Sequence, residues 1–443
     1  MNKLYYKSPI LIQHLLTTIY GFKLKRKRYT KNYFKYFEAY KNNEINEENE
    51  LKNLLIHLKK NINVFRDIDI RNNPIDVIKN LNFTYKDDLR KDLNEYSWKI
   101  GNVVVNKTGG TTGKSLKVYS TIEDQNKRMA YLDYIKYQHG VEPFSKRASF
   151  TGKDILPENH KNILWRRNYF MNQTLYASYK MNKDNVKHIF DDMKKLKPES
   201  IDGFPTSIHL LAKYILNNNL KVNWKVKAVF PTAEVLTKHM REDIEKAFNT
   251  ICVDQYASSE GAPFLYSSDG EEFKIGHETG LFEFFKVDSN IYDMVVTSYI
   301  NYGTVIVRYK IGDQVIINSD KNYINSVEDS FKILKIIGRN SDYLVGNDEN
   351  IVTSANMSNV YKDFGDQIIQ SQFIQKDKNK FIINLVVTND YKTNKSKSEQ
   401  ILKEKLTHRL GLNNTYIFNY FEELPKEKSG KTRFIINEWR MNK

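Results

Sequence analysis

Lys107-Thr108-Gly109-Gly110-Thr111-Thr112-Gly113-Lys114-Ser115 is the stretch of this 443-residue sequence that decides its fold. Glycines allow the backbone to approach a phosphate group, and their amides then act as hydrogen-bond donors. The threonine hydroxyls add neutral donors, and the ammonium group of Lys114 adds a positive charge. We therefore interpret Thr108–Lys114 as a phosphate-binding loop, with a flexible hairpin tip as the structural alternative.

The residues around this loop distinguish between two kinds of phosphate site. A Walker A loop has the form Gly, four residues, Gly-Lys-Ser/Thr, and it opens a helix. Gly113-Lys114-Ser115 fits the end of that pattern, but Thr108 stands at the first glycine position. The following Leu116–Ser120 alternates like a strand, and the preceding Val103–Val105 is typical of a buried strand. The expected strand–loop–strand arrangement argues against P-loop NTPases.

Periodicity over the rest of the chain predicts an α/β fold with a β-rich region. The candidate elements are helices over 208–215 and 240–248 and strands over 226–230, 251–253 and 331–337. Strands that alternate with helices are typical of a wound α/β domain. From Leu281 to Ile317 the sequence predicts consecutive strands separated by short turns.

After Gly338 the pattern restarts as a small α+β unit. Strands are expected over 381–387 and 417–421, and Leu402, Leu406 and Leu410 form a helical stripe that ends at Gly411. We therefore predict two domains, residues 1–338 and residues 339–443, of ordinary domain size.

Composition limits the class of protein without choosing a function. Lys and Arg number 69 against 53 Asp and Glu, a net charge of +16 that suits anionic partners such as nucleotides, coenzyme A, nucleic acid or membrane phosphates. The single cysteine, Cys252, excludes a disulfide framework and a cysteine-rich metal site. No apolar run approaches the length of about 18 residues that a membrane span needs, and we expect a cytoplasmic protein.

The N-terminal segment predicts an amphipathic helix. Ile12, Leu15, Leu16 and Ile19 follow helical spacing, and a basic run from Lys23 to Arg28 comes after them. Weak peripheral contact of residues 10–28 with an anionic membrane is one interpretation. We favour the other, a helix whose apolar stripe packs on the core.

Five segments in order resemble motifs of the adenylate-forming superfamily, which includes acyl-CoA synthetases and luciferase-like enzymes. The first is Thr108–Lys114. The other four are Tyr256-Ala257-Ser258-Ser259-Glu260-Gly261, Arg308-Tyr309-Lys310-Ile311-Gly312-Asp313, Gly338-Arg339-Asn340-Ser341-Asp342 and Leu424-Pro425-Lys426-Glu427-Lys428-Ser429-Gly430-Lys431-Thr432-Arg433. This resemblance implies a large N-terminal adenylate-forming domain with a small C-terminal α+β lid domain that moves on a hinge at Asp342 or Asn340. From the residues alone, Gly338 would serve as the hinge equally well.

Two further segments resemble one branch of that superfamily. Gly203-Phe204-Pro205-Thr206-Ser207 and Phe230-Pro231-Thr232-Ala233-Glu234 are similar to the phenylacetate–CoA ligase branch. The N-terminal stretch, with Ser8-Pro9, Gly21 and Arg28-Tyr29, is similar to CapK-type proteins found with polysaccharide biosynthesis.

The resemblance implies a role for each site residue. Lys431 would bridge the carboxylate and the α-phosphate as the catalytic cation, and its alternative is a solvated lysine beside Lys426 and Lys428. Glu260 would be the magnesium-linked catalytic glutamate, a donor type that Mg²⁺ prefers. Asp313 would hold the ribose hydroxyls and Arg339 the ribose or a phosphate, although a Gly-Asp pair is also a common turn.

The adenine pocket is implied in the same way. Tyr256 would lie against the base, with Ala233 and Glu234 lining the pocket, although ordinary packing is the alternative for one of 29 tyrosines. The family's glycine after that tyrosine is Ala257 here, while Ser258 or Ser259 keeps the hydroxyl of its threonine. Some members of the branch hold zinc, but no cysteine follows Glu260 to join His277, so we predict no zinc.

The resulting functional hypothesis is an ATP- and Mg²⁺-dependent ligase that activates a carboxylic acid and transfers the acyl group to coenzyme A. Its alternative is transfer to a glycan-linked amine or hydroxyl. A basic nucleic-acid-binding protein is a further alternative, but no binding motif supports specific nucleic-acid recognition. The superfamily implies a monomer or a homodimer.

Overall fold

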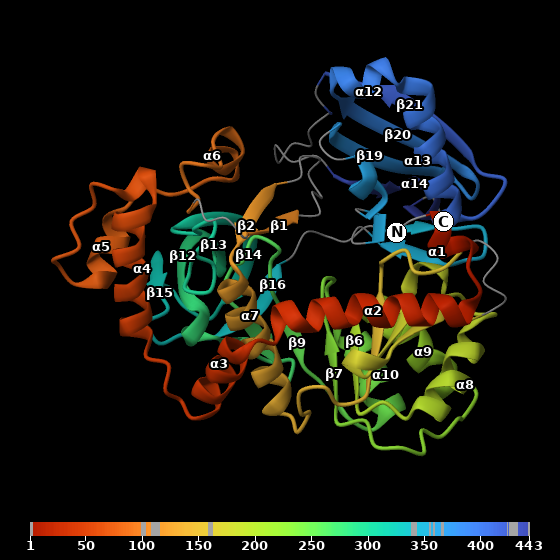
Figure 1. Ribbon diagram of the computed structural model, residues 1–443, viewed down its shortest axis with the longest axis horizontal. Coiled ribbons are helices and arrows are strands. Elements are labelled where there is room, and N and C mark those ends of the chain that lie inside the picture. The colour runs from red at the N-terminus through yellow and green to blue at the C-terminus, as the bar shows by residue number, and fades with distance from the viewer. Residues whose placement is uncertain are drawn as a thin grey trace.

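The computed structural model describes residues 3–98, 103–107, 116–157, 163–337, 343–353, 356–357, 359–364, 367–422, 424 and 433–441 (Figure 1). Helices dominate the first part of the chain. They are α1 (Lys3–Lys7), α2 (Ile10–Arg28), α3 (Lys31–Lys41), α4 (Glu47–Asn61), α5 (Pro74–Asn80), α6 (Lys86–Lys91) and α7 (Ile122–Tyr137). Side-chain caps begin several of them. At the start of α7 the hydroxyl of Thr121 accepts a hydrogen bond from the amide of Asp124 at 2.9 Å, and the Asp124 carboxylate accepts one from the amide of Thr121 at 2.8 Å.

Six of the described strands form a wound α/β sheet in the order β4-β5-β3-β6-β7-β8. They are β3 (Arg147–Thr151), β4 (Trp165–Asn168), β5 (Gln173–Ala177), β6 (Ser200–Gly203), β7 (Ala228–Pro231) and β8 (Ile251–Cys252). All pair in parallel except the edge strand β4, which is antiparallel to β5. Helices α8 (Val186–Leu196), α9 (Pro205–Asn217) and α10 (Lys238–Phe248) connect these strands, and their apolar residues at helical spacing are buried. The predicted α/β fold class is confirmed here.

The predicted β-rich region is a second, antiparallel sheet. Among the described residues it has the order β15-β12-β13-β14-β16, with β12 (Gly280–Asp288), β13 (Ile291–Ser298), β14 (Tyr309–Ile317), β15 (Tyr323–Asn325) and β16 (Ile333–Ile337). Leu281 lies opposite Thr297, and Val296 lies opposite Tyr309. A small sheet of β9 (Asp254–Tyr256), β10 (Leu265–Ser267) and β11 (Lys274–Ile275) lies beside it.

The phosphate-loop segment has the predicted strand–loop–strand setting. Strands β1 (Val104–Lys107) and β2 (Lys117–Ser120) pair antiparallel, with Lys107 opposite Lys117, and no helix follows the loop directly. The loop residues 108–115 lie outside the described residues. The expectation of a buried strand before the loop is wrong, because β1 belongs to a two-stranded ribbon that packs on one face and leaves Val105 half exposed.

The C-terminal elements have a core of their own. Strands β19 (Ile368–Asp377), β20 (Lys380–Val387), β21 (Thr415–Tyr420) and β22 (Ile435–Asn437) form a described sheet ordered β21-β20-β19-β22, next to the hairpin β17 (Tyr343–Val345) and β18 (Ile351–Thr353). Helices α12 (Asn389–Thr393), α13 (Lys395–Leu410) and α14 (Glu438–Met441) accompany them. Leu402, Leu406 and Leu410 are fully buried, and Gly411 ends α13 at a φ of 97°. The predicted hinge, 338–342, lies outside the described residues, so the division after residue 338 stays a prediction.

Helix α2 contradicts our preferred interpretation of the N-terminal segment. It runs across the front of the molecule in Figure 1, and its buried residues are Gln13, Thr17, Thr18 and Gly21. The apolar stripe at Ile12, Leu15, Leu16 and Ile19 is exposed to solvent. The expectation of a core-packed stripe is therefore wrong: the polar side of the helix faces the protein. In the part of the chain that the structure describes, no helix is both long and apolar enough to cross a membrane.

Candidate active site

The predicted site residues divide into two groups. Ala233, Glu234, Tyr256, Ser258, Ser259, Glu260 and Asp313 are described by the structure. The loop residues Thr108, Gly109, Gly110, Thr111, Thr112, Gly113 and Lys114, together with Arg339 and Lys431, lie outside the described residues. The roles of both groups stay predictions, and the structure gives the contacts of the first group.

Tyr256 and Asp313 meet although they come from different sheets. Tyr256 ends β9, and Asp313 lies within β14 directly after Gly312, whose φ is 84°. The phenol of Tyr256 donates a 2.7 Å hydrogen bond to Oδ2 of Asp313, and both side chains are half-buried. The predicted base-binding ring and the predicted ribose-binding carboxylate therefore form one unit, and Tyr256 does more than fill space.

The segment that carries Ala233 and Glu234 lies next to Tyr256. Thr232 pairs with Gln255 in an isolated parallel bridge, so the end of β7 continues alongside β9. Ala233 has a φ of 71°, a left-handed backbone conformation that is uncommon for a residue with a side chain. Such conformations persist where the surroundings fix them, often at binding sites.

Glu234 connects the two branch-like segments of the sequence. The hydroxyl of Thr206, in the first turn of α9, donates to Oε2 of Glu234 at 2.8 Å. The chain can turn from β6 into α9 because Gly203 has a φ of 127° and a Cβ there would lie 2.1 Å from the carbonyl oxygen of Phe150. The hydrogen bond holds the Glu234 carboxylate at the carboxyl end of the parallel sheet, where wound α/β proteins bind ligands.

Glu260 is a buried residue in the turn after β9, and it lies beside two cations. Its carboxylate is 3.4 Å from the ammonium nitrogen of Lys86, which begins α6. The half-buried guanidinium of Arg128, on α7, donates to the carbonyl oxygen of Ser258. Burial lowers the pKa of Arg128 to about 10, against the opposing attraction of Glu260. The turn itself is closed by a 3.2 Å hydrogen bond from the amide of Ala262 to the hydroxyl of Ser258.

A single carboxylate in this position suits a magnesium ion that also binds phosphate oxygens. Mg²⁺ commonly takes one or two carboxylates and keeps several waters. Glu260 could supply the carboxylate, and Lys86 would compete with the ion for it. Sequence reasoning missed Lys86 and Arg128, because neither belongs to a motif or a spacing that points to a site.

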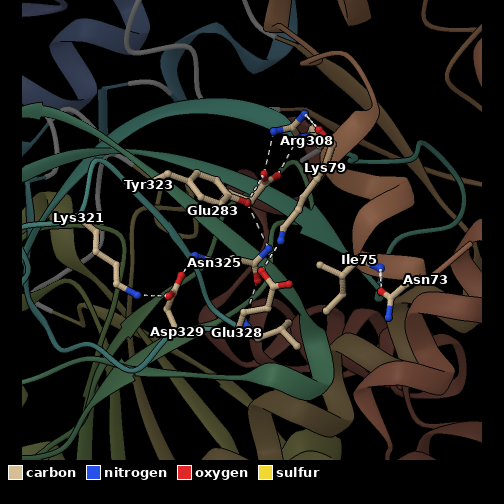
Figure 2. Close-up of polar contacts among 11 residues, drawn as sticks. Asn73, Ile75, Lys79, Glu283, Arg308, Lys321, Tyr323, Asn325, Glu328 and Asp329 are labelled. Atoms are coloured by element: carbon tan, nitrogen blue, oxygen red, sulfur yellow. Dashed lines mark hydrogen bonds and ion pairs between the residues drawn. The ribbon is translucent and has the colours of Figure 1, made fainter.

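Arg308, which opens the Arg-Tyr-x-x-Gly-Asp segment, has a structural role. Its guanidinium forms two hydrogen bonds with the fully buried carboxylate of Glu283, at 3.0 and 2.8 Å. Figure 2 shows how Tyr323 also donates to Glu283, at 3.0 Å. The Arg308 guanidinium donates as well to the carbonyls of Lys79 and Leu81, which ties β12 and β14 to the N-terminal helices. This network holds the strand on which Asp313 lies.

The C-terminal unit contacts the large sheet through a small polar cluster. Arg409, at the end of α13, donates to Oδ1 of Asp154 at 2.8 Å and is 1 % exposed. Nε2 of His408 lies 3.1 Å from the carbonyl oxygen of Leu156, and the amide of Asn350 donates to the carbonyl of Tyr179 at 2.7 Å. These contacts hold the C-terminal unit against Asp154 and Leu156, which follow the carboxyl end of β3, and against Tyr179.

Possible metal ligands other than Glu260 gather at one place in the described residues. Nε2 of His209 on α9 lies 2.7 Å, and Nε2 of His239 on α10 lies 3.3 Å, from Oδ2 of Asp243. His277 instead lies 3.5 Å from Glu47, whose hydrogen bond raises the pKa of the imidazole. The absence of zinc stays a prediction.

The architecture is that of the adenylate-forming ligase fold. 2-Hydroxyisobutyryl-CoA ligase, solved with 2-HIB-AMP and CoA in its thioesterification state, matches this chain with a TM-score of 0.54 at 14 % identity, over 89 % of each chain. An open conformation of that ligase, also with 2-HIB-AMP and CoA, matches at a TM-score of 0.50 and 12 % identity, over 88 % of this chain and 91 % of the other. At such low identity these likenesses show the fold alone.

The sequence relatives give the family. Residues 344–438 match the model of the CapK C-terminal domain. Protein CapK of Staphylococcus aureus is 38 % identical over 450 aligned positions, which cover 99 % of both chains. This chain belongs to the CapK family.

Proposed function

We propose that this chain is an ATP-dependent ligase that activates a carboxylic acid as an acyl-adenylate and passes the acyl group to an acceptor. The hydrogen bond between Tyr256 and Asp313 carries the proposal, because it joins a flat aromatic face to a carboxylate that can accept two ribose hydroxyls. The adenylate-forming fold supports it.

The reaction has two steps that balance. An oxygen of the carboxylate attacks the α-phosphorus of ATP, the bond from that phosphorus to the bridging oxygen of the β-phosphate breaks, and pyrophosphate leaves. The acceptor then attacks the acyl carbon, the bond from that carbon to the phosphate oxygen breaks, AMP leaves, and the proton of the acceptor passes to solvent. The first step brings two anions together, so cations and oriented donors must lower the repulsion.

The predicted residues divide this work between binding and charge neutralisation. Thr108–Lys114 would hold the β- and γ-phosphates, Ser258 or Ser259 would add a hydroxyl, and Ala233 and Glu234 would line the base pocket. Glu260 would hold the Mg²⁺ that shares the phosphate charge. Arg339 would contact the ribose or a phosphate. Lys431 would bring an ammonium group from the lid to the carboxylate and α-phosphate.

A pyrophosphate-exchange screen over a library of carboxylic acids tests the adenylation step. We expect label to return to ATP with at least one acid, in a Mg²⁺-dependent manner. Lys431→Ala should abolish most of the exchange, whereas the neighbouring Lys428→Ala should retain it. Equal exchange by both variants would show that Lys431 has no catalytic role. No exchange with any acid would count against adenylation.

The acceptor divides the proposal into two versions. We infer coenzyme A from the acyl-CoA synthetase-like fold, in which case the acid, ATP and coenzyme A yield a thioester. Membership of the CapK family supports the alternative of an amine or hydroxyl acceptor on a glycan. With an acid found in the exchange screen, AMP release that coenzyme A does not accelerate would favour the alternative.

A further inference from the structure

The outward face of α2 carries seven large apolar side chains in contact with solvent. Leu11 is 80 % exposed, and Leu15 and Tyr20 are each 57 % exposed. The remaining members of this face are Ile12, Leu16, Ile19 and Phe22, each at least 38 % exposed. Contiguous exposed apolar surface of this kind marks an interaction site in soluble proteins.

The inner face of α2 explains why the apolar side points outward. The helix covers β4, the edge strand of the six-stranded sheet, whose backbone groups need polar partners. The amide of Arg167 donates to Nδ1 of His14 at 3.0 Å, and the hydroxyl of Thr18 accepts from the amide of Tyr169 at 3.3 Å. Nε of the fully buried Arg166 donates to the side-chain oxygen of Gln13 at 2.7 Å.

Close packing fixes this orientation of the helix. A Cβ at Gly21 would lie 2.0 Å from the side-chain oxygen of Asn168, so the helix touches the strand at that point. Rotation of α2 to bury its apolar stripe would break the hydrogen bonds of Gln13, His14 and Thr18. Donors at the edge of the sheet would then lose their partners. The exposed stripe is therefore a stable feature of the fold.

The same region is strongly and uniformly basic. The first 37 residues contain nine Lys and Arg and no Asp or Glu. On α2 the exposed Lys23, Arg26 and Lys27 follow the apolar residues on the same side of the helix, because positions 19, 23, 26 and 27 are spaced by three and four. The face thus changes from apolar to cationic along its length.

Aromatic rings extend the face beyond the helix. Phe22 packs against Phe170 with ring centroids 4.8 Å apart, and Phe170 and its neighbour Tyr169 are 49 % and 67 % exposed. Tyrosine favours the boundary between lipid headgroups and acyl chains, and phenylalanine is common on the apolar face of helices that lie on membranes. Lys25 also connects α2 to the neighbouring loop, since its ammonium lies 4.0 Å from the ring centroid of Phe144.

We propose that the outward face of α2, together with Tyr169 and Phe170, docks on an anionic membrane surface with the helix in the plane of the interface. An apolar face beside lysines and arginines is the composition of helices that lie on membranes. A second copy of this chain fits less well, because a twofold pairing of α2 would set its basic end against either the same basic end or the apolar end of the partner helix. The proposal is independent of the ligase reaction.

Vesicle co-sedimentation of the full-length protein tests this. We expect binding to phosphatidylcholine–phosphatidylglycerol vesicles, weaker binding at high salt, and little binding to phosphatidylcholine alone. Lys23→Gln/Arg26→Gln/Lys27→Gln should weaken binding about 100-fold, since each basic side chain near an anionic surface contributes about a factor of five. Leu15→Ser/Ile19→Ser should also weaken binding strongly. The matched control Val287→Ser/Leu412→Ser, which removes exposed apolar residues elsewhere, should bind like the parent.

Each other outcome overturns the proposal. Equal binding to neutral vesicles would show that lipid charge plays no part. Concentration-dependent dimerisation in analytical ultracentrifugation that Leu15→Ser/Ile19→Ser abolishes, without vesicle binding, would assign the face to a second copy. Absence of both vesicle binding and dimerisation would show that the face does not dock on membranes. Circular dichroism and thermal unfolding of all variants should match the parent, because every substituted side chain is exposed.

Discussion

The phenol of Tyr256 donates a 2.7 Å hydrogen bond to the carboxylate of Asp313, a residue 57 positions further along the chain. The bond crosses from the small sheet of β9 to the large antiparallel sheet of β14. Two segments that resemblance alone had paired with one nucleotide are therefore in direct contact. A substitution of either residue should therefore change the hydrogen bonding of the other side chain.

Asp313→Asn should raise the KM for ATP about 10- to 100-fold, because a hydrogen bond to a charged group is worth about 1.5–3 kcal/mol. Tyr256→Phe keeps the ring and loses only the phenol, so its effect should be a few-fold at most. Steady-state kinetics of pyrophosphate exchange measure both. An unchanged KM in Asp313→Asn, with the fold intact by circular dichroism, would contradict the ribose assignment.

Lys86 should compete with Mg²⁺ for Glu260, since its ammonium lies 3.4 Å from that carboxylate. Lys86→Met should lower the Mg²⁺ concentration for half-maximal exchange about two- to fivefold, because a partly exposed ion pair contributes about 1 kcal/mol or less. Lys91→Met, at the other end of α6, is the matched control. Glu260→Gln should remove most of the Mg²⁺-dependent exchange. A higher Mg²⁺ requirement in Lys86→Met would show that the ammonium helps the ion rather than competes with it.

Glu283 and Glu328 both pair with a cation in the region of Figure 2, yet their removal should have unequal effects on stability. The side chain of Glu283 is 1 % exposed, so Glu283→Ala leaves the buried charge of Arg308 uncompensated, a cost of about 3–5 kcal/mol. Glu328 is 43 % exposed, and Glu328→Ala should cost about 1 kcal/mol or less. Urea unfolding midpoints measure both. Equal midpoints would refute the structural role assigned to Arg308.

Much of the fold could be predicted from periodicity, and the main error shows where that signal stops. Ile208, Leu211 and Ile215 recur at helical spacing, and all are buried against the sheet. The same spacing in α2 identified a helix and its apolar side, but not the neighbour. Its neighbour is an edge strand that needs polar groups, and no local pattern in residues 10–28 records that requirement.

Candidate site residues could be proposed from the sequence only where they form motifs. Tyr256, Glu260 and Asp313 belong to segments with recognisable spacing, whereas Lys86 and Arg128 reach Glu260 from helices far away in sequence. Tertiary structure alone brings them together. Conversely, the arginine of the Arg-Tyr-x-x-Gly-Asp segment could be read as a ligand contact, and its burial against Glu283 is visible only in three dimensions.

The docking of the C-terminal unit should depend on pH through His408. Burial lowers the pKa of this imidazole to about 4, and the charges of Lys180 and Arg409 act in the same direction against the attraction of Asp154. An undocked histidine has a pKa of about 6.5, so its protonation at lower pH favours undocking. The stabilisation of the docked state is fully present above pH 6.5 and is lost as the pH falls towards 4. Between pH 7 and pH 5 the ratio of docked to undocked protein should fall by about 10-fold or more.

Small-angle scattering and limited proteolysis across that range report the opening of the C-terminal unit. His408→Gln keeps a donor toward the carbonyl of Leu156 but cannot be protonated, so its opening should vary less with pH than that of the parent. Asp154→Ala, which removes the partner of the buried Arg409, should open the unit at every pH. The exposed His239→Gln on α10 serves as the control and should follow the parent. If His408→Gln opens with the same pH profile as the parent, another group controls the docking.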